Sequence, residues 1–115
     1  MQIENSVEDL IGVLSLSGRL TVNDQPGVLK DAVTDLVHRG ARHVILDLSR
    51  VGYIDSTRLG ELIAAHVSIS RNGGRLILAA TPPRVVELLT LSSLADVFEQ
   101  FRTVEDARAS FSPGR

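Results

Sequence analysis

The tripeptide Asp55-Ser56-Thr57 is the part of the sequence best suited to chemistry, and it stands directly before a helical pattern. A hydroxyl at a helix start has two competing roles, because it can cap the first turn or be presented to a kinase. Phosphorylation would give Ser56 about −1.5 to −2 charge beside backbone N–H groups and the positive end of a helix dipole, which can hold a phosphate. Asp47 and Asp55 are expected to make this surface acidic, so an added dianion would repel an acidic partner. We therefore interpret Ser56 as a candidate surface switch.

Other combinations of reactive side chains are weaker. Three histidines are spread along the chain: His38, His43 and His66. They lack the paired spacing of metal ligands, so we expect surface or helix-end histidines and no metal or other cofactor. A hydrolytic triad of Ser56, Asp55 and a histidine is conceivable, but the nucleophile-elbow pattern around the serine is absent. Gly73-Gly74 precedes a strand pattern, which indicates a turn rather than a phosphate cradle. The sequence favours a protein that is not an enzyme.

The composition is that of one globular domain, which we place at residues 1–111 with a loose tail at 112–115. Hydrophobic residues make up 43% and charged residues 23% of the 115 residues. The formal charge of −2 has no basic stripe, and the aromatic content of 3% offers little surface for base stacking. We expect a protein partner and no nucleic acid.

Nothing in the sequence suggests export or membrane insertion. The first residues lack a basic segment followed by an apolar one, and no apolar run approaches the ~20 residues that span a bilayer. There is no cysteine, which excludes disulfides and a thiolate zinc site. A cytoplasmic location without membrane contact is the simplest expectation.

The elements that would position Ser56 follow from hydrophobic periodicity. Two early strands, the second ended by Gly18, form an expected hairpin, and a helix capped by Asn23 or Asp24 runs to Gly40. The later patterns predict, in chain order, a strand at 43–49, a loop containing Gly52, a helix from 56 to 71, a strand at 75–80, a helix at 83–89, an edge strand at 97–101 and a helix at 103–111.

This alternation of strands and helices predicts a small α/β domain, with a mixed central sheet of about four to five strands flanked by about four helices. Functional groups in such sheets gather beyond the carboxyl ends of parallel strands. The segment from Asp47 to Asp55 follows one such strand, so the fold also points to Ser56.

The same residues resemble a known family. The segments 44–49 and 51–54 and the run Asp55-Ser56-Thr57-Arg58-Leu59-Gly60 closely resemble the motif of STAS domains. The similarity extends over nearly the whole chain, through the segments 73–78, 85–89 and 94–98.

The resemblance implies an anti-sigma-factor antagonist that regulates transcription by partner switching. In such proteins the serine matching Ser56 is phosphorylated by the anti-sigma factor, itself a serine kinase, and a serine phosphatase reverses the modification. The unmodified protein would bind the anti-sigma factor, and phosphorylation would release it. Thr57 is an alternative acceptor. Weak nucleotide binding is implied by resemblance alone, and the oligomeric state stays open.

Two departures from the family pattern concern partner recognition. Arg58 stands where glycine is usual, and Thr21 stands where many members have an aspartate. Asp24 can replace that acid or only cap its helix, whereas Arg58 can pair with a phosphate on Ser56, contact an acidic partner, or be a solvated surface arginine. The predicted partner surface comprises Asp24, Asp55, Ser56, Thr57, Arg58 and Leu59. The departure at Arg58 also motivates an alternative, a STAS scaffold subunit of a stress-signalling or lipid-transport assembly without a phospho-switch.

Overall fold

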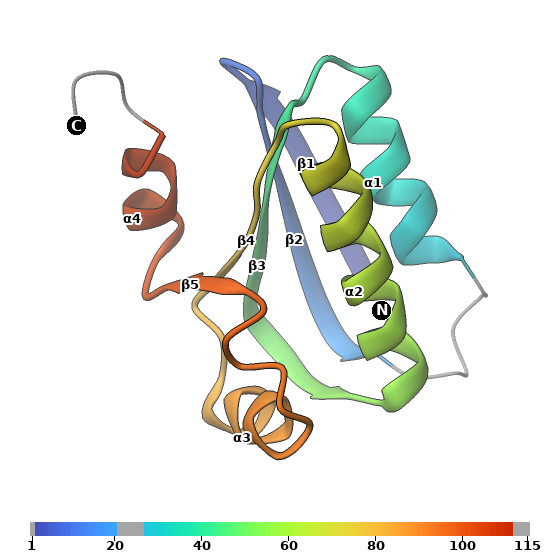
Figure 1. Ribbon diagram of the computed structural model, residues 1–115, viewed down its shortest axis with the longest axis vertical. Coiled ribbons are helices and arrows are strands. Elements are labelled where there is room, and N and C mark those ends of the chain that lie inside the picture. The colour runs from blue at the N-terminus through green and yellow to red at the C-terminus, as the bar shows by residue number, and fades with distance from the viewer. Residues whose placement is uncertain (1, 21–26, 112–115) are drawn as a thin grey trace.

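Five strands and four helices make up the part of the chain that the computed structural model describes, residues 2–20 and 27–111 (Figure 1). In chain order they are β1 (Gln2–Glu8), β2 (Ile11–Leu20), α1 (Val28–His38), β3 (His43–Ile54), α2 (Ser56–Arg71), β4 (Leu76–Ala79), α3 (Pro83–Leu91), β5 (Glu99–Phe101) and α4 (Val104–Ala109). The strands form one sheet in the order β1-β2-β3-β4-β5. β1 and β2 are an antiparallel hairpin and the other neighbours are parallel, which confirms the predicted mixed α/β fold.

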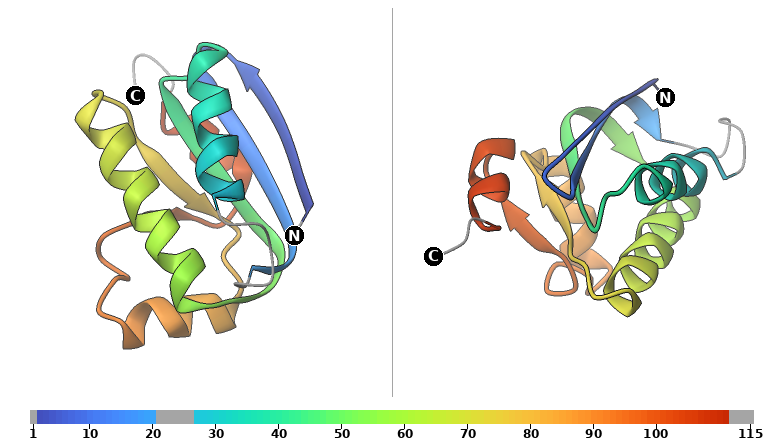
Figure 2. Two further views of the ribbon diagram at one scale, coloured as in Figure 1. Left: turned by 90° about the vertical axis from the view of Figure 1, so that its right-hand side faces the viewer. Right: turned by 90° about the horizontal axis from the view of Figure 1, so that it is seen from above.

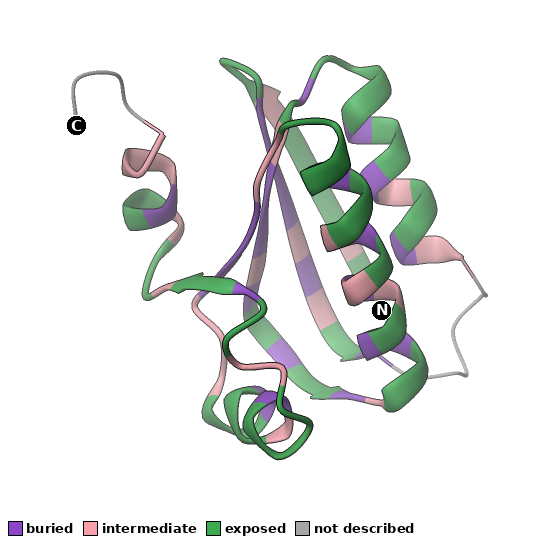
Figure 3. Ribbon diagram, in the orientation of Figure 1, coloured by how far each residue is buried: buried purple, intermediate pink, exposed green. Residues whose placement is uncertain are grey.

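The helices cover both faces of the sheet. Helices α1 and α2 lie on one face, α4 lies on the other, and α3 packs near the carboxyl end of β3 (Figures 1 and 2). Buried residues are concentrated in the central strands and on the sides of α1 and α2 that face the sheet (Figure 3).

The continuous apolar runs of the central strands are explained by this two-sided cover. Neighbouring side chains in a strand point to opposite faces. Leu46 of β3 lies in the large core under α1 and α2, together with its register partners Leu14 and Leu78. Ile45 and Ile77 face the other way, into a smaller core that contains Ala107 of α4. Both faces are thus apolar, as expected for parallel strands between helices.

Strands β2 and β3 are longer than the sequence predicts. The expected loop after Ser49 is strand, and β3 continues to Ile54, which pairs with Leu20 of β2. Val51 is buried and keeps this part of β3 in the core. Gly18 does not end β2: it has a φ of 96° and lies at one of two register irregularities, but the pairing with β3 continues to Leu20. The prediction of a loop at this position was wrong, and β3 delivers the chain directly to α2.

The turn after α2 depends on a glycine with no room for a side chain. The N–H of Gly74 donates to the Ile69 carbonyl, 2.9 Å away, and closes the helix. A Cβ on Gly74 would lie 1.9 Å from the carbonyl oxygen of Arg42. This close approach explains the turn role predicted for Gly73-Gly74 and places β4 beside β3.

Candidate functional site

The start of α2 is built by the aspartate that precedes it. Asp55 is the N-cap, with φ −95° and ψ 175°, and its Oδ1 accepts a hydrogen bond from the backbone N–H of Arg58 at 2.9 Å. The backbone carbonyl of Asp55 accepts from the N–H of Leu59, also at 2.9 Å. The side-chain cap of α2 is therefore provided by Asp55 and not by Ser56.

Ser56 and Thr57 occupy the first two positions of α2, and both are exposed. Their position at the amino end of a 16-residue helix puts them next to N–H groups of the first turn and the positive end of the helix dipole. A phosphate at either hydroxyl would meet favourable backbone electrostatics without entering the core.

Arg58 and Leu59 lie in the interior, contrary to the prediction of a surface arginine. Arg58 is 1% and Leu59 is 5% exposed, and the guanidinium of Arg58 forms an ion pair with Oε2 of Glu61. The physical reason is helical rotation: at about 100° per residue, two steps from Ser56 turn a side chain from solvent towards the sheet. The spacing of Arg58 and Glu61, three residues apart, was the signal for this pair.

Asp24 and Thr21 lie outside the described residues, as do Asn23 and the start of the predicted first helix. In the described part, α1 begins at Val28 after Gly27, which has a φ of 80°.

Asp47 is remote from Ser56, so the prediction that it makes the same surface acidic was wrong. Eight residues of extended chain separate Asp47 from Asp55, which is roughly 25 Å at the rise of a strand. The carboxylate of Asp47 is engaged locally: Oδ2 accepts from the Ser15 hydroxyl at 3.3 Å and Oδ1 accepts from the N–H of Ser49 at 3.0 Å.

A groove beside Ser56 was not foreseen. It has a volume of about 480 Å³ and separates the β3–α2 junction from α3. Its lining residues are Gly52, Tyr53, Ile54, Asp55, Ser56, Arg84, Val85, Glu87, Leu88 and Leu91. Leu91 is 77% and Tyr53 41% exposed, so apolar surface flanks the serine. The local sequence signal was Leu91, which departs from the buried stripe formed by Val85 and Leu89.

The histidines are dispersed. His38 is exposed at the end of α1, as predicted, whereas His43 and His66 are half-buried and correct the expectation of surface positions. His66 packs edge-on against Phe98, with ring centroids 5.4 Å apart. Within residues 2–20 and 27–111, no three histidine, aspartate, glutamate or cysteine side chains converge in a way that would hold a metal ion.

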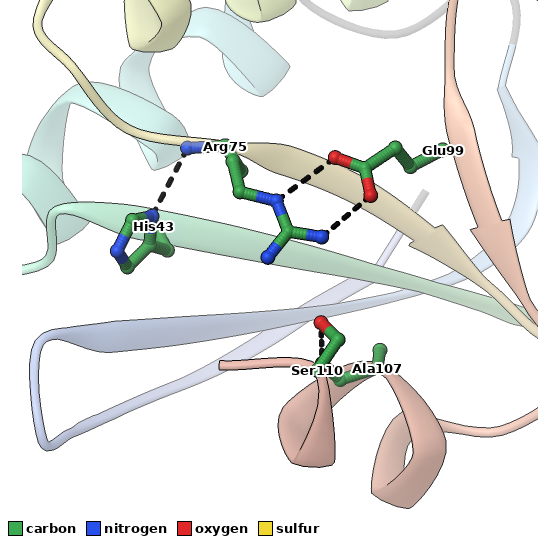
Figure 4. Close-up of polar contacts among 5 residues, drawn as sticks. All are labelled: His43, Arg75, Glu99, Ala107 and Ser110. Carbon is green, nitrogen blue, oxygen red and sulfur yellow. Dashed lines mark hydrogen bonds and ion pairs between the residues drawn. The ribbon is translucent and has the colours of Figure 1, made fainter. Parts of the chain in front are cut away.

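His43 belongs to a polar cluster at the opposite end of β3 (Figure 4). Its Nδ1 accepts from the backbone N–H of Arg75 at 3.0 Å, and Nε of Arg75 donates to Oε1 of Glu99 at 2.9 Å. The ring of Phe111 stacks on His43 at 4.4 Å, and the Arg75 guanidinium lies 4.5 Å from that ring. In the last turn of α4, the Ser110 hydroxyl donates to the Ala107 carbonyl at 2.6 Å. The Arg75–Glu99 and His43–Phe111 contacts hold β5 and the end of α4 against the neighbouring strands.

The electrostatics of this cluster follow from burial and charge. Burial, followed by the positive charges of Arg42 and Arg75, lowers the pKa of His43 below 6.5. The hydrogen bond from Arg75 holds the pKa of Glu99 below its ordinary value. The cluster is engaged in holding the fold and is distant from Ser56.

None of the helices in the described part of the chain is both long and apolar enough to cross a bilayer.

Comparison with known proteins identifies the family. The STAS domain model matches residues 2–107, and the chain therefore belongs to the STAS family. Among curated proteins, it is similar to the anti-sigma-B factor antagonist of Staphylococcus aureus strain NCTC 8325, with 26% identity over 97 residues, 84% of this chain and 89% of the relative.

Solved structures agree with this assignment. A crystal structure of a candidate anti-sigma factor antagonist from Thermotoga maritima superimposes with a TM-score of 0.85 and 26% identity, covering 94% of this chain and 92% of that one. The unphosphorylated form of the anti-sigma factor antagonist SpoIIAA shares the fold, with a TM-score of 0.79, 19% identity and 95% of each chain covered. A phosphorylated form of the Bacillus SpoIIAA superimposes with a TM-score of 0.74 and 19% identity, covering 96% of this chain and all of that one.

Proposed function

We propose that this protein is an anti-sigma-factor antagonist whose binding is switched at Ser56. The unmodified protein binds an anti-sigma factor that is also a serine kinase, and phosphorylation of Ser56 by that kinase releases the complex. A serine phosphatase restores the binding form. The protein regulates transcription through these contacts and catalyses no reaction itself.

The observation that carries this proposal is that the cap of α2 and the exposed hydroxyl belong to different residues. Asp55 caps the helix, so the adjacent Ser56 is exposed at the first helical position without a capping duty. The names of the similar proteins supply the regulatory context. Thr57 is exposed one residue further on and is the alternative acceptor.

The groove explains how one phosphate can change affinity. Tyr53 and Leu91 line the same groove as Ser56 and offer exposed apolar surface, as a protein interface needs. A dianion placed in the middle of such a contact must be desolvated, and it meets the carboxylates of Asp55 and Glu87. A loss of ~1.4 kcal/mol already weakens binding tenfold.

The partner surface of this proposal consists of Asp55, Ser56 and Thr57 with the groove, and Asp24 remains part of it as a sequence prediction. Arg58 and Leu59 are buried and act by shaping α2 rather than by touching the partner. The alternative of a scaffold subunit without a phospho-switch was motivated by arginine at position 58, where the family usually has glycine. Because Arg58 is buried beside Glu61, this departure does not by itself alter the exposed surface around Ser56.

The test is a phosphorylation assay with anti-sigma kinases from the same genome, followed by peptide mass spectrometry. We expect phosphate on Ser56, and no modification of the Ser56→Ala variant beyond a minor product at Thr57. Ser110, engaged with a backbone carbonyl in α4, serves as the matched control through Ser110→Ala, which should be modified like the wild type. Phosphate confined to residues other than 56 and 57 would refute the proposal.

A further inference from the structure

We infer that Arg84 of α3 is the residue that receives the phosphate of phosphorylated Ser56, holding it across the groove by an ion pair. This inference rests on the phosphorylation proposed above and adds a specificity-determining residue to it. The modified serine would then be drawn towards α3 instead of standing free at the start of α2.

Ser56 and Arg84 line the same groove from two different elements. Ser56 lies on the wall formed by the β3–α2 junction and Arg84 on the wall formed by α3, and both are exposed. The groove has a volume of about 480 Å³, the size of a pocket for a small molecule, so it has room for a phosphoryl group.

Arg84 is also the cation best placed for the task. Among the described residues that line the groove, it carries the one positive charge. Arg58 is closer to Ser56 in sequence, but it is buried and paired with Glu61. Arg19, on the neighbouring strand, lies 4.7 Å over the ring of Tyr53 and is not part of the groove lining.

Helix α3 carries this charge against its own electrostatic preference. The first turn of a helix favours acidic side chains, yet the first turn of α3 contains no acid and has Arg84 at its second position. In the described part of the chain Arg84 forms no ion pair, so its guanidinium is available. An anion arriving in the groove would offset the unfavourable placement, because arginine binds phosphate through two parallel hydrogen bonds.

Phosphorylation would therefore change two charges at the partner surface: it adds an anion at Ser56 and neutralises the cation at Arg84. In the unmodified protein Arg84 is exposed beside the apolar surface of Tyr53 and Leu91 and can contact an acidic partner. After phosphorylation the same guanidinium is neutralised by Ser56, so the partner loses a cation as well as meeting an anion. The carboxylates of Asp55 and Glu87 also line the groove and would repel a phosphate, so a nearby cation would stabilise the phosphate more strongly there.

The test uses full-length protein carrying phosphoserine at position 56, introduced during translation so that no kinase is needed. The second pKa of the phosphate, about 6 in a free phosphoserine, is followed by ³¹P NMR. A nearby cation favours the dianion and lowers this pKa. We expect Arg84→Gln to raise it by about 0.5 unit or more, and Arg84→Lys to raise it by less, because lysine keeps the charge but not the paired donors.

The matched control is Arg71→Gln, which removes the same charge from the exposed last turn of α2. It should leave the phosphate titration unchanged. Equal titrations in the wild type and the Arg84→Gln variant, or equal shifts in both glutamine variants, would overturn the inference. Failure of the proposed function would appear in other experiments, as an absence of phosphorylation by the kinase or as unchanged affinity for the partner. Neither result alters this titration.

Discussion

Replacing Arg58 by methionine should lower the free energy of unfolding by about 2–3 kcal/mol, although Arg58 lies next to a surface switch. Methionine keeps most of the buried stem, so the change removes the guanidinium rather than the packing. The side chain of Arg58 is 1% exposed and that of Glu61 is 18% exposed. The substitution therefore leaves a largely buried carboxylate without its cation.

The magnitude follows from these exposures. Breaking a fully buried ion pair by removing one partner costs about 3–5 kcal/mol, whereas exposed pairs contribute about 0.2–1 kcal/mol. Glu61 retains some contact with water, which places the cost somewhat below that range, at about 2–3 kcal/mol. Removing both charges, as Arg58→Met with Glu61→Gln, should recover much of the loss and give a coupling energy of about 1–2 kcal/mol.

The assay is urea unfolding of the wild type, the two single variants and the double variant, followed by circular dichroism. The double-mutant cycle isolates the pair from the other effects of each change. A loss below about 0.5 kcal/mol for Arg58→Met, typical of a surface substitution, would refute the placement of Arg58 in the interior.

Three further perturbations test other parts of the structure. Asp55→Ala removes the N-cap and should destabilise the protein by about 1 kcal/mol in urea, while Asp55→Asn should stay within a few tenths of the wild type. Gly74→Ala should lower the free energy of unfolding by more than about 2 kcal/mol in the same assay, because its Cβ would meet a backbone carbonyl. Gly60→Ala lies inside α2 with nothing within 4 Å of the new Cβ, so it should raise the free energy of unfolding by about 0.5–1 kcal/mol. The pKa of His43 lies below 6.5 in the folded state, so the unfolded chain binds the proton more tightly. The free energy of unfolding must therefore fall as the pH drops below 6.5. Urea titrations at several pH values should show a smaller fall for the His43→Gln variant than for the wild type.

The central elements of the fold were predictable because each carries a strong local pattern. The run at 43–48 is apolar at nearly every position, which indicates a strand covered on both faces. Leu62 and Ile69 lie at helical spacing within the helix predicted from 56 to 71, and α2 buries both.

The errors arose where partners distant in sequence decide the structure. The segment after Ser49 contains Gly52 and charged residues, which locally favour a loop, yet its pairing with β2 and the burial of Val51 keep it in the sheet. Such pairing across more than thirty residues leaves no mark in a local pattern.

The site was predictable in part for the same reason. The place of Ser56 at a helix start follows from the residues around it. The facing wall, with Arg84 and Leu91, comes from a helix that begins twenty-seven residues later and could be found only in three dimensions. The burial of Arg58 was missed because charged residues are usually exposed, and because Arg58 stands where the family usually has glycine.

The affinity of the cognate anti-sigma factor for two forms of this protein tests the central claim most directly. Isothermal titration calorimetry would compare the unmodified protein with protein carrying phosphoserine at position 56. We predict that the phosphate weakens binding at least about tenfold, or ~1.4 kcal/mol. Equal affinities for the two forms would contradict the switch at Ser56.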